Sequence, residues 1–128
     1  AQEERPKLAT AHAIAQYLRP RLSHLTHEEF HVLCFNSRNV LVADVCAAKG
    51  GLATCVVDPA SLFRQVLQVA TATALVFAHN HPSGAPEPSI QDIGLTKHLC
   101  EGADYLSVRV LDHIIIGGRD YVSFMEQG

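Results

Sequence analysis

The feature that most constrains this 128-residue chain is a short apolar run that leads into two histidines. Residues 73–78 have the length and composition of a strand buried on both faces, and His79-Asn80-His81 follows directly. Side chains alternate along an extended strand, so His79 and His81 should project to the same side. The run therefore predicts a central strand with two imidazoles at its carboxyl end, where α/β sheets normally hold their chemistry.

A third ligand is predicted on the next element. Residues 82–88 contain three prolines and a glycine, which exclude regular structure until Ser89 opens a helix. Asp92 lies one turn into that helix. Two histidines and one carboxylate form a three-ligand set for a divalent metal, with zinc the best match. Three protein ligands leave the fourth tetrahedral position for water, as in catalytic sites.

Each part of this pattern has a simpler interpretation. The segment Ser89-Ile90-Gln91-Asp92 fits a capping box, in which the hydroxyl and the carboxylate satisfy free backbone N–H groups. His-x-His pairs also arise by chance in a chain with eight histidines. A strand ending in His-x-His, followed by a Pro/Gly loop and then Ser-x-x-Asp, is much rarer than its parts. Capping and a role at the metal site are also compatible at Ser89.

Spacing of apolar residues and breakers predicts the scaffold around this strand. We expect helices over residues 10–22 (ending near Pro20), 59–71 (capped by Asp58) and 89–102 (stopped by Gly102). We expect strands over residues 30–35, 40–47, 75–80, 105–111, 112–116 and 121–124, with a short further run over 52–57. Alternation of strand and helix around the centre implies crossover connections and some parallel pairing.

The sequence resembles the JAMM (MPN+) metallopeptidase signature in its bacterial RadC form. The resemblance rests on residues 79–84, on Pro88-Ser89 and Asp92, and extends upstream to residues 35–39 and downstream to residues 111–117. It implies a three-layer α/β/α domain with a mixed central sheet, of the cytidine-deaminase-like class. RadC proteins usually carry a helix-hairpin-helix region before this domain, and nothing in this sequence resembles one.

The resemblance also implies roles for individual residues. Zinc would be held by His79, His81 and Asp92, and Ser89 would help to stabilise the oxyanion of a tetrahedral intermediate. The family pattern supplies a glutamate near the start of the strand at residues 30–35.

Glu28 and Glu29 both precede that strand. Glu29 is favoured as the proton shuttle because it abuts the apolar run, although both acids could simply be solvated. Glu87, in the loop, competes only by its nearness to the ligands. His113 matches a family position, but we expect a structural histidine there.

Composition indicates a single domain over residues 10–128 behind an N-terminal arm of residues 1–9. We expect a soluble cytoplasmic protein, since no apolar run approaches a membrane span and no signal-peptide pattern is seen. The net charge of −3 argues against a strongly basic nucleic-acid surface. Four cysteines without a Cys-x-x-Cys pair are interpreted as reduced structural thiols.

Four functions compete. The motif favours a zinc-dependent peptidase or isopeptidase acting on a polypeptide of unknown identity. A zinc deaminase requires His-x-Glu and Pro-Cys-x-x-Cys, which this chain lacks. A DNA-repair factor or metal-dependent nuclease fits the RadC resemblance and the chemistry of an activated water, but not the acidic charge. A non-catalytic binding module is the fourth hypothesis, although all three ligand positions are present.

Overall fold

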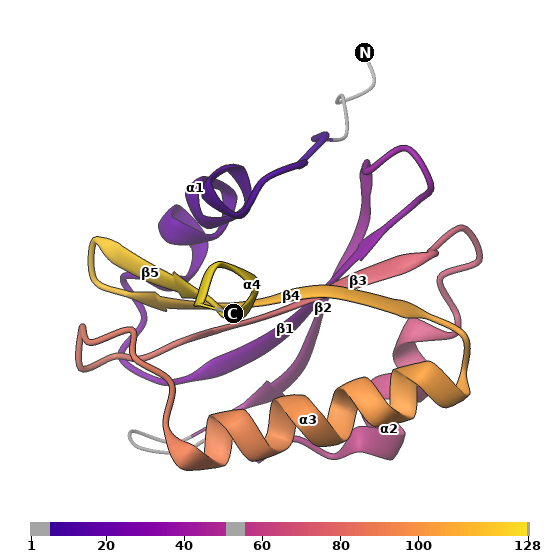
Figure 1. Cartoon of the computed structure of the whole chain (residues 1–128). Coiled ribbons are helices and arrows are strands. Elements are labelled where there is room, and N and C mark those ends of the chain that lie inside the picture. The colour runs from indigo at the N-terminus through magenta and orange to yellow at the C-terminus, as the bar shows by residue number, and fades with distance from the viewer. Residues whose placement is uncertain (1–5, 51–55, 128) are drawn as a thin grey trace.

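A computed structural model describes residues 6–50 and 56–127 of the chain. Within these residues, five strands form one mixed sheet in the order β2-β1-β3-β4-β5 (Figure 1). The strands are β1 (Glu29–Phe35), β2 (Leu41–Lys49), β3 (Ala74–Asn80), β4 (Arg109–Gly117) and β5 (Asp120–Ser123). The helices are α1 (Ala11–Leu22), α2 (Pro59–Val66), α3 (Ile90–Tyr105) and α4 (Phe124–Gln127).

Strand β3 lies at the centre of the sheet, as predicted. It pairs antiparallel with β1 and parallel with β4, and all seven of its residues are buried. The parallel pair requires a crossover, which the loop after β3 and helix α3 provide. The carboxyl end of β3 and the amino end of α3 therefore lie at the same edge of the sheet.

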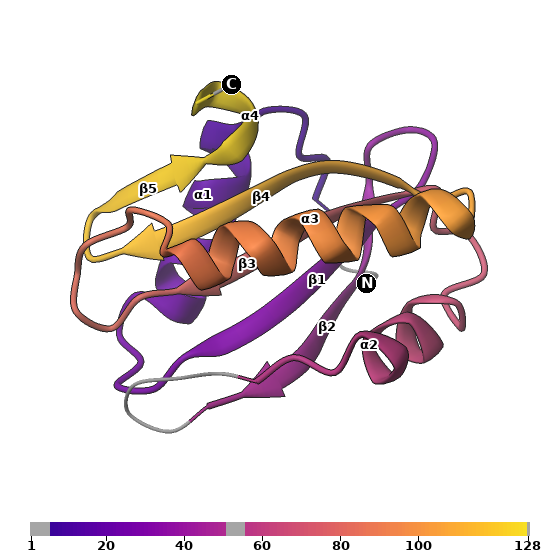
Figure 2. The same ribbon diagram turned by 60° about the horizontal axis from the view of Figure 1, so that its bottom comes forward.

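Helices cover both faces of the sheet and make three layers (Figures 1 and 2). Val76 and Ala78 of β3 belong to the core under α1, whereas Leu75 and Phe77 belong to the core under α2 and α3. By the same alternation His79 faces α3. This architecture confirms the predicted three-layer α/β/α class with a mixed sheet.

Two helices end at different residues from those predicted. Helix α2 stops at Val66, and the following residues form turns rather than reaching residue 71. This segment is rich in β-branched residues, which lowers its helix propensity. Helix α3 continues past Gly102 to Tyr105. Gly102 is a packing residue instead of a stop, because a Cβ atom there would lie 2.9 Å from the ring of Phe63.

The prediction of separate strands over residues 105–111 and 112–116 was wrong. A single strand, β4, begins only at Arg109 and continues to Gly117, because α3 extends to Tyr105. The register of β4 against β3 shifts between Leu75 and Val76, whose partners are Val110 and Asp112. Leu111 is thus the extra residue of a bulge, and its local break in alternation resembles a strand boundary. Helix α1 likewise continues through Pro20 to Leu22.

The remaining predictions concern the ends of elements. The strands predicted over residues 30–35 and 40–47 form β1 and β2, which pair antiparallel as a hairpin, with β2 extending to Lys49. In the predicted N-terminal arm, Lys7 forms a bridge with Val40 beside this hairpin. Of the short run predicted over residues 52–57, residues 56–57 are not in a strand and the rest lie outside the described residues. No helix in the described part of the chain is long and apolar enough to cross a membrane.

Candidate metal centre

Three metal-ligating side chains meet where β3 ends and α3 begins. The Nε2 atoms of His79 and His81 are 3.1 Å apart. Asp92 Oδ2 lies 3.0 Å from Nε2 of His81, and Asp92 Oδ1 lies 3.2 Å from Nε2 of His79. Zinc bonds of about 2.0–2.2 Å place tetrahedral N and O donors about 3.3–3.5 Å apart. The three donors therefore fit one small divalent ion with adjustments of a few tenths of an ångström.

The first turn of α3 fixes the Asp92 carboxylate. Ser89 caps the helix through its Oγ atom, which accepts from the Asp92 N–H at 3.0 Å, and the Ser89 N–H donates to Asp92 Oδ2 at 2.9 Å. The predicted capping box is thus present. Burial raises the pKa of Asp92, but in the metal-free protein hydrogen bonding to the protonated His79 and His81 rings outweighs it and holds the pKa well below its usual range. The carboxylate is ionised, as a ligand must be.

A chain of hydrogen bonds sets the tautomer of His79. The Thr96 hydroxyl donates to the Asp92 carbonyl at 2.7 Å, so its oxygen accepts from Nδ1–H of His113. Nε2 of His113 is then an acceptor for Nδ1–H of His79, at 2.7 Å. This leaves the lone pair of His79 Nε2 directed at the centre. The pKa of His113 lies well below its usual value, chiefly because the ring is buried and also because a positive charge on it would be repelled by a protonated His79, so His113 is neutral.

His81 is oriented by the loop that follows it. Its Nδ1–H donates to the carbonyl of Ala85 at 2.9 Å, which again leaves Nε2 for a metal. The hydrogen bond with Asp92 raises the pKa of His81 despite its burial, and the charges of Asp92 and Glu28 act in the same direction. His79 is buried whereas His81 and Asp92 are partly exposed, so the centre is open on one side.

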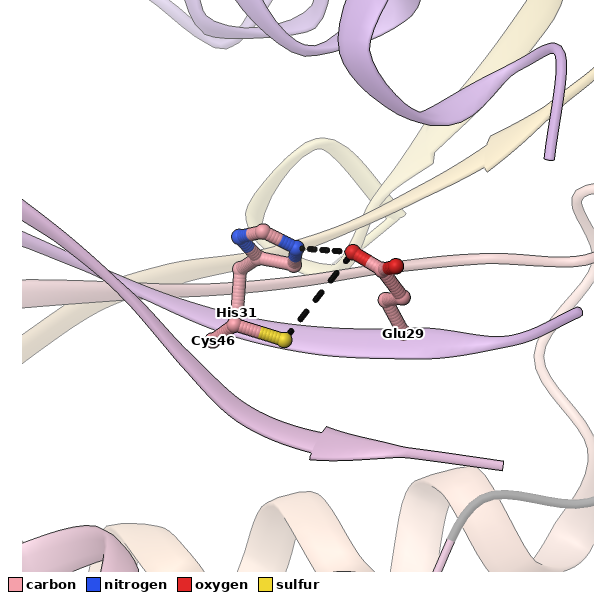
Figure 3. A group of neighbouring side chains, drawn as sticks. All are labelled: Glu29, His31 and Cys46. Atoms are coloured by element: carbon pink, nitrogen blue, oxygen red, sulfur yellow. Dashed lines mark hydrogen bonds and ion pairs between the residues drawn. The ribbon is translucent and has the colours of Figure 1, made fainter.

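The structure does not bring Glu29 to this centre. Phe30 pairs with His79 and stacks on its ring, so β1 turns Phe30 toward α3 and its neighbour Glu29 toward α1. Glu29 Oε2 contacts Nε2 of His27 at 2.8 Å. Glu29 Oε1 contacts Nε2 of His31 at 2.9 Å (Figure 3). Glu28 lies one residue before β1, and its charge acts on His81, so it is the acid of this pair that lies near the metal centre.

Asn80, the residue between the two histidines, holds the backbone on both sides of Glu28. Its Oδ1 accepts from the N–H of Glu29 at 2.8 Å, and its Nδ2 donates to the carbonyl of His27 at 2.9 Å. Asn80 therefore fixes the start of β1 beside the end of β3.

The structure also shows where Ser83, Glu87 and His113 lie. Ser83 accepts a hydrogen bond from the N–H of Ala85, as expected for a turn. Glu87 is exposed in the loop. His113 is a buried, structural histidine, as predicted, and its contact with His79 was not foreseen. The only signal for that contact was the position of His113 before an apolar run, which does not show its neighbour across the sheet.

Fold and geometry together define an α/β domain with a candidate metal centre of two histidines and one aspartate, of the kind that metal-dependent hydrolases use. The family model described as the RadC-like JAB domain matches residues 8–128. The chain belongs to this family.

Curated relatives agree with this assignment. The chain is 36% identical over 124 residues to a UPF0758 protein of Symbiobacterium thermophilum, an alignment covering 97% of this chain and 53% of the relative. It is 38% identical to a UPF0758 protein of Salinibacter ruber and 39% identical to one of Staphylococcus carnosus. Those alignments cover 99% and 95% of this chain, and 54% of each relative. The chain therefore spans about half the length of these relatives.

Proposed function

We propose that this domain is a zinc-dependent hydrolase of the metallopeptidase or isopeptidase type. His79, His81 and Asp92 would hold the metal. The observation that carries the proposal is the convergence of three donor atoms with both histidine tautomers fixed for ligation. When bound, a zinc ion supplies Lewis acidity, which acidifies a water molecule and polarises a carbonyl.

The proton shuttle in this proposal is Glu28, in place of Glu29. Hydrolysis of an amide requires a group that takes a proton from water and delivers it to the leaving amine. Glu28 is half-buried, and its charge acts on His81. Asn80 fixes the backbone on both sides of it. Glu29 is instead held by His27 and His31 on the opposite face.

Ser89 would stabilise the oxyanion. Its Oγ atom uses a lone pair to accept from the Asp92 N–H, which leaves the hydroxyl proton free to donate. The residue is exposed at the open side of the centre. A donor at this position would act where negative charge develops on the substrate oxygen.

A polypeptide is the favoured substrate. The net charge of −3 gives little electrostatic attraction for DNA, whose binding depends on contacts from Lys and Arg to phosphate. A nuclease remains the second outcome of the test below, since a metal centre of this kind can also act on a phosphodiester.

The experiment combines metal analysis with cleavage assays on the zinc-loaded protein. The substrates are a peptide library, an isopeptide-linked polypeptide, and single-stranded and duplex DNA. We expect Glu28→Gln to keep its zinc at the His79 centre and to lose peptide cleavage. The matched control Glu87→Gln, at an exposed acid in the loop beside the ligands, should cleave at close to the wild-type rate. Glu29→Gln should retain the peptide cleavage that Glu28→Gln loses. His81→Ala should lose both zinc at this centre and activity.

Three results would overturn parts of the proposal. Zinc-dependent cutting of DNA without peptide cleavage would replace the peptidase by a nuclease. Loss of activity in Glu29→Gln but not in Glu28→Gln would return the shuttle to Glu29. A zinc-loaded protein that cleaves none of these substrates would favour a binding module over an enzyme.

A further inference from the structure

A second group of donor side chains lies on the other face of the sheet, under α1. Glu29 and His31 alternate along β1, and Cys46 of β2 is the pairing partner of His31. Glu29 Oε1 lies 2.9 Å from His31 Nε2 and 3.9 Å from the Sγ atom of Cys46 (Figure 3). One ligating atom from each of these three residues lies within 4.8 Å of the other two.

His31 is oriented as metal-bound histidines are. Its Nδ1–H donates to Asp44 Oδ1 at 2.6 Å, which directs Nε2 toward Glu29 and Cys46. Asp44 is fixed in turn by the hydroxyl of Tyr17 on α1, which donates to Oδ2 at 3.0 Å. A carboxylate on the outer nitrogen of a histidine is the usual outer contact of a zinc ligand, because it fixes the ring and the tautomer.

His27 stands next to this group without belonging to it. Its Nε2 atom lies 2.8 Å from Glu29 Oε2, so the two oxygens of this carboxylate stand between two imidazoles, and a small movement of His27 would add a fourth donor. The donors then comprise two nitrogens, one oxygen and one sulfur, a mixture that suits zinc and other borderline cations rather than magnesium or calcium. Tetrahedral zinc places such donors about 3.3–3.6 Å apart. The distances of 2.9 and 3.9 Å bracket this range.

We propose that Glu29, His31 and Cys46 form a second zinc site, and that His27 moves in as fourth ligand when the metal binds. Four protein ligands leave no open position, so the expected role of this site is structural. A metal there would join β1 to β2 next to Glu28. The site shares no ligand with the His79 centre and lies across the sheet from it, so its existence is independent of the proposed hydrolase activity.

Without a metal, the same side chains satisfy one another as ion pairs and hydrogen bonds. Glu29 accepts from two histidines, and the thiol of Cys46 contacts Glu29 Oε1 and the carbonyl of Ala48. The cluster is therefore compatible with a purely structural network. Only a measurement that detects a metal–sulfur bond separates the two interpretations.

Cobalt substitution provides that measurement. A thiolate bound to Co²⁺ gives a sulfur-to-metal charge-transfer band in the near ultraviolet, and the His79 centre contains no sulfur ligand. We expect the band when Co²⁺ is added to the reduced protein, and we expect it to persist in His81→Ala. It should disappear in Cys46→Ser. The control Cys100→Ser, on α3, should keep the band, and so should Cys55→Ser.

Zinc stoichiometry, measured against a competing chelator, gives the second readout. The wild-type protein should bind two zinc ions, His81→Ala one, Cys46→Ser one, and the double variant none. Glu29→Gln should also lose one zinc while its circular dichroism stays that of a folded protein. A single zinc in the wild type, together with no charge-transfer band in His81→Ala, would overturn the second site and leave the first intact.

Discussion

His113 contributes no donor to the metal centre, yet its Nε2 atom lies 2.7 Å from Nδ1 of His79. The two rings lie in the buried layer between the sheet and α3, and Phe124 stacks on His113 from the other side. Because Thr96 holds the opposite nitrogen of His113, the only tautomer that satisfies this chain directs the lone pair of His79 toward the centre. His113 is therefore a positioning residue for a ligand 34 positions earlier in the chain.

Removal of this support should weaken metal binding. We expect His113→Ala to lower the zinc affinity of the His79 centre by about 10- to 100-fold, as is usual for outer contacts of metal-bound histidines. Thr96→Val breaks the same series of hydrogen bonds with little change in side-chain volume, and we expect it to weaken zinc binding less than His113→Ala does. His98→Ala, an exposed histidine on the same helix, is the control. Zinc competition titrations would measure this, and unchanged affinity in both Thr96→Val and a folded His113→Ala would contradict the role.

Asn80 links the metal centre to the proposed shuttle, and its removal should separate metal binding from turnover. Asn80→Ala leaves the N–H of Glu29 and the carbonyl of His27 without their partner, so the backbone around Glu28 should shift. We expect zinc at the His79 centre to be retained and kcat to fall about tenfold or more, equivalent to about 1.4 kcal/mol of barrier. Asn80→Asp keeps the acceptor oxygen but not the N–H donor, so its kcat should lie between those of the wild type and Asn80→Ala. Equal kcat in all three proteins would rule out this link.

Gly117 allows the loop after β3 to approach the end of β4. A Cβ atom there would lie 2.6 Å from the backbone nitrogen of Pro86, with no flexible side chain to give way. Gly117→Ala should push away the Ala85 carbonyl that orients His81, destabilising the fold by about 1–3 kcal/mol and weakening zinc binding.

The matched control is Gly94→Ala, on the exposed face of α3, where a Cβ meets nothing within 4 Å. This change should raise the free energy of unfolding by about 0.5–1 kcal/mol, because alanine is the better helix former. Urea denaturation of both variants measures the difference. A Gly117→Ala protein as stable as the wild type would show that the loop can move without cost.

The grouping of His79, His81 and Asp92 was predictable because it depends on local rules. Alternation along one strand places His79 and His81 together, and a capping box places Asp92 in the first turn of the next helix. Both rules use residues that are close in the sequence. The order of strands and helices predicted crossover connections and some parallel pairing, whereas the three-layer class came from the family resemblance.

Contacts across the sheet were not predictable from these rules. Both faces of β1 are buried, so its sequence does not show which face carries Glu29; the pairing of Phe30 with His79 decides it. Similarly, Cys46 follows the pattern of a buried structural thiol. Its place beside Glu29 depends on the register of β1 against β2, including the shift between Phe30 and His31.

The ion pairs under α1 should make the stability of the metal-free protein depend on pH. Burial lowers the pKa of His31, but hydrogen bonds with Asp44 and Glu29 outweigh it and raise the pKa above the ordinary value of 6.5. A histidine with a raised folded-state pKa stabilises the fold fully below its unfolded pKa, and this contribution is lost as the pH rises through the folded pKa. His81, whose pKa is also raised, acts in the same direction.

We therefore expect the free energy of unfolding, measured by urea denaturation with a chelator present, to fall as the pH rises above about 6.5. His31→Gln should reduce this slope without abolishing it, since His81 remains. On the acid side, the lowered pKa of Glu29 stabilises the fold above its ordinary value of 4.5, and this contribution is lost as the pH falls below that value. His24 is exposed, so the control variant His24→Gln should show the wild-type dependence of the free energy of unfolding on pH. If His31→Gln and the wild type show the same slope above pH 6.5, the ion pairs of His31 do not contribute to stability.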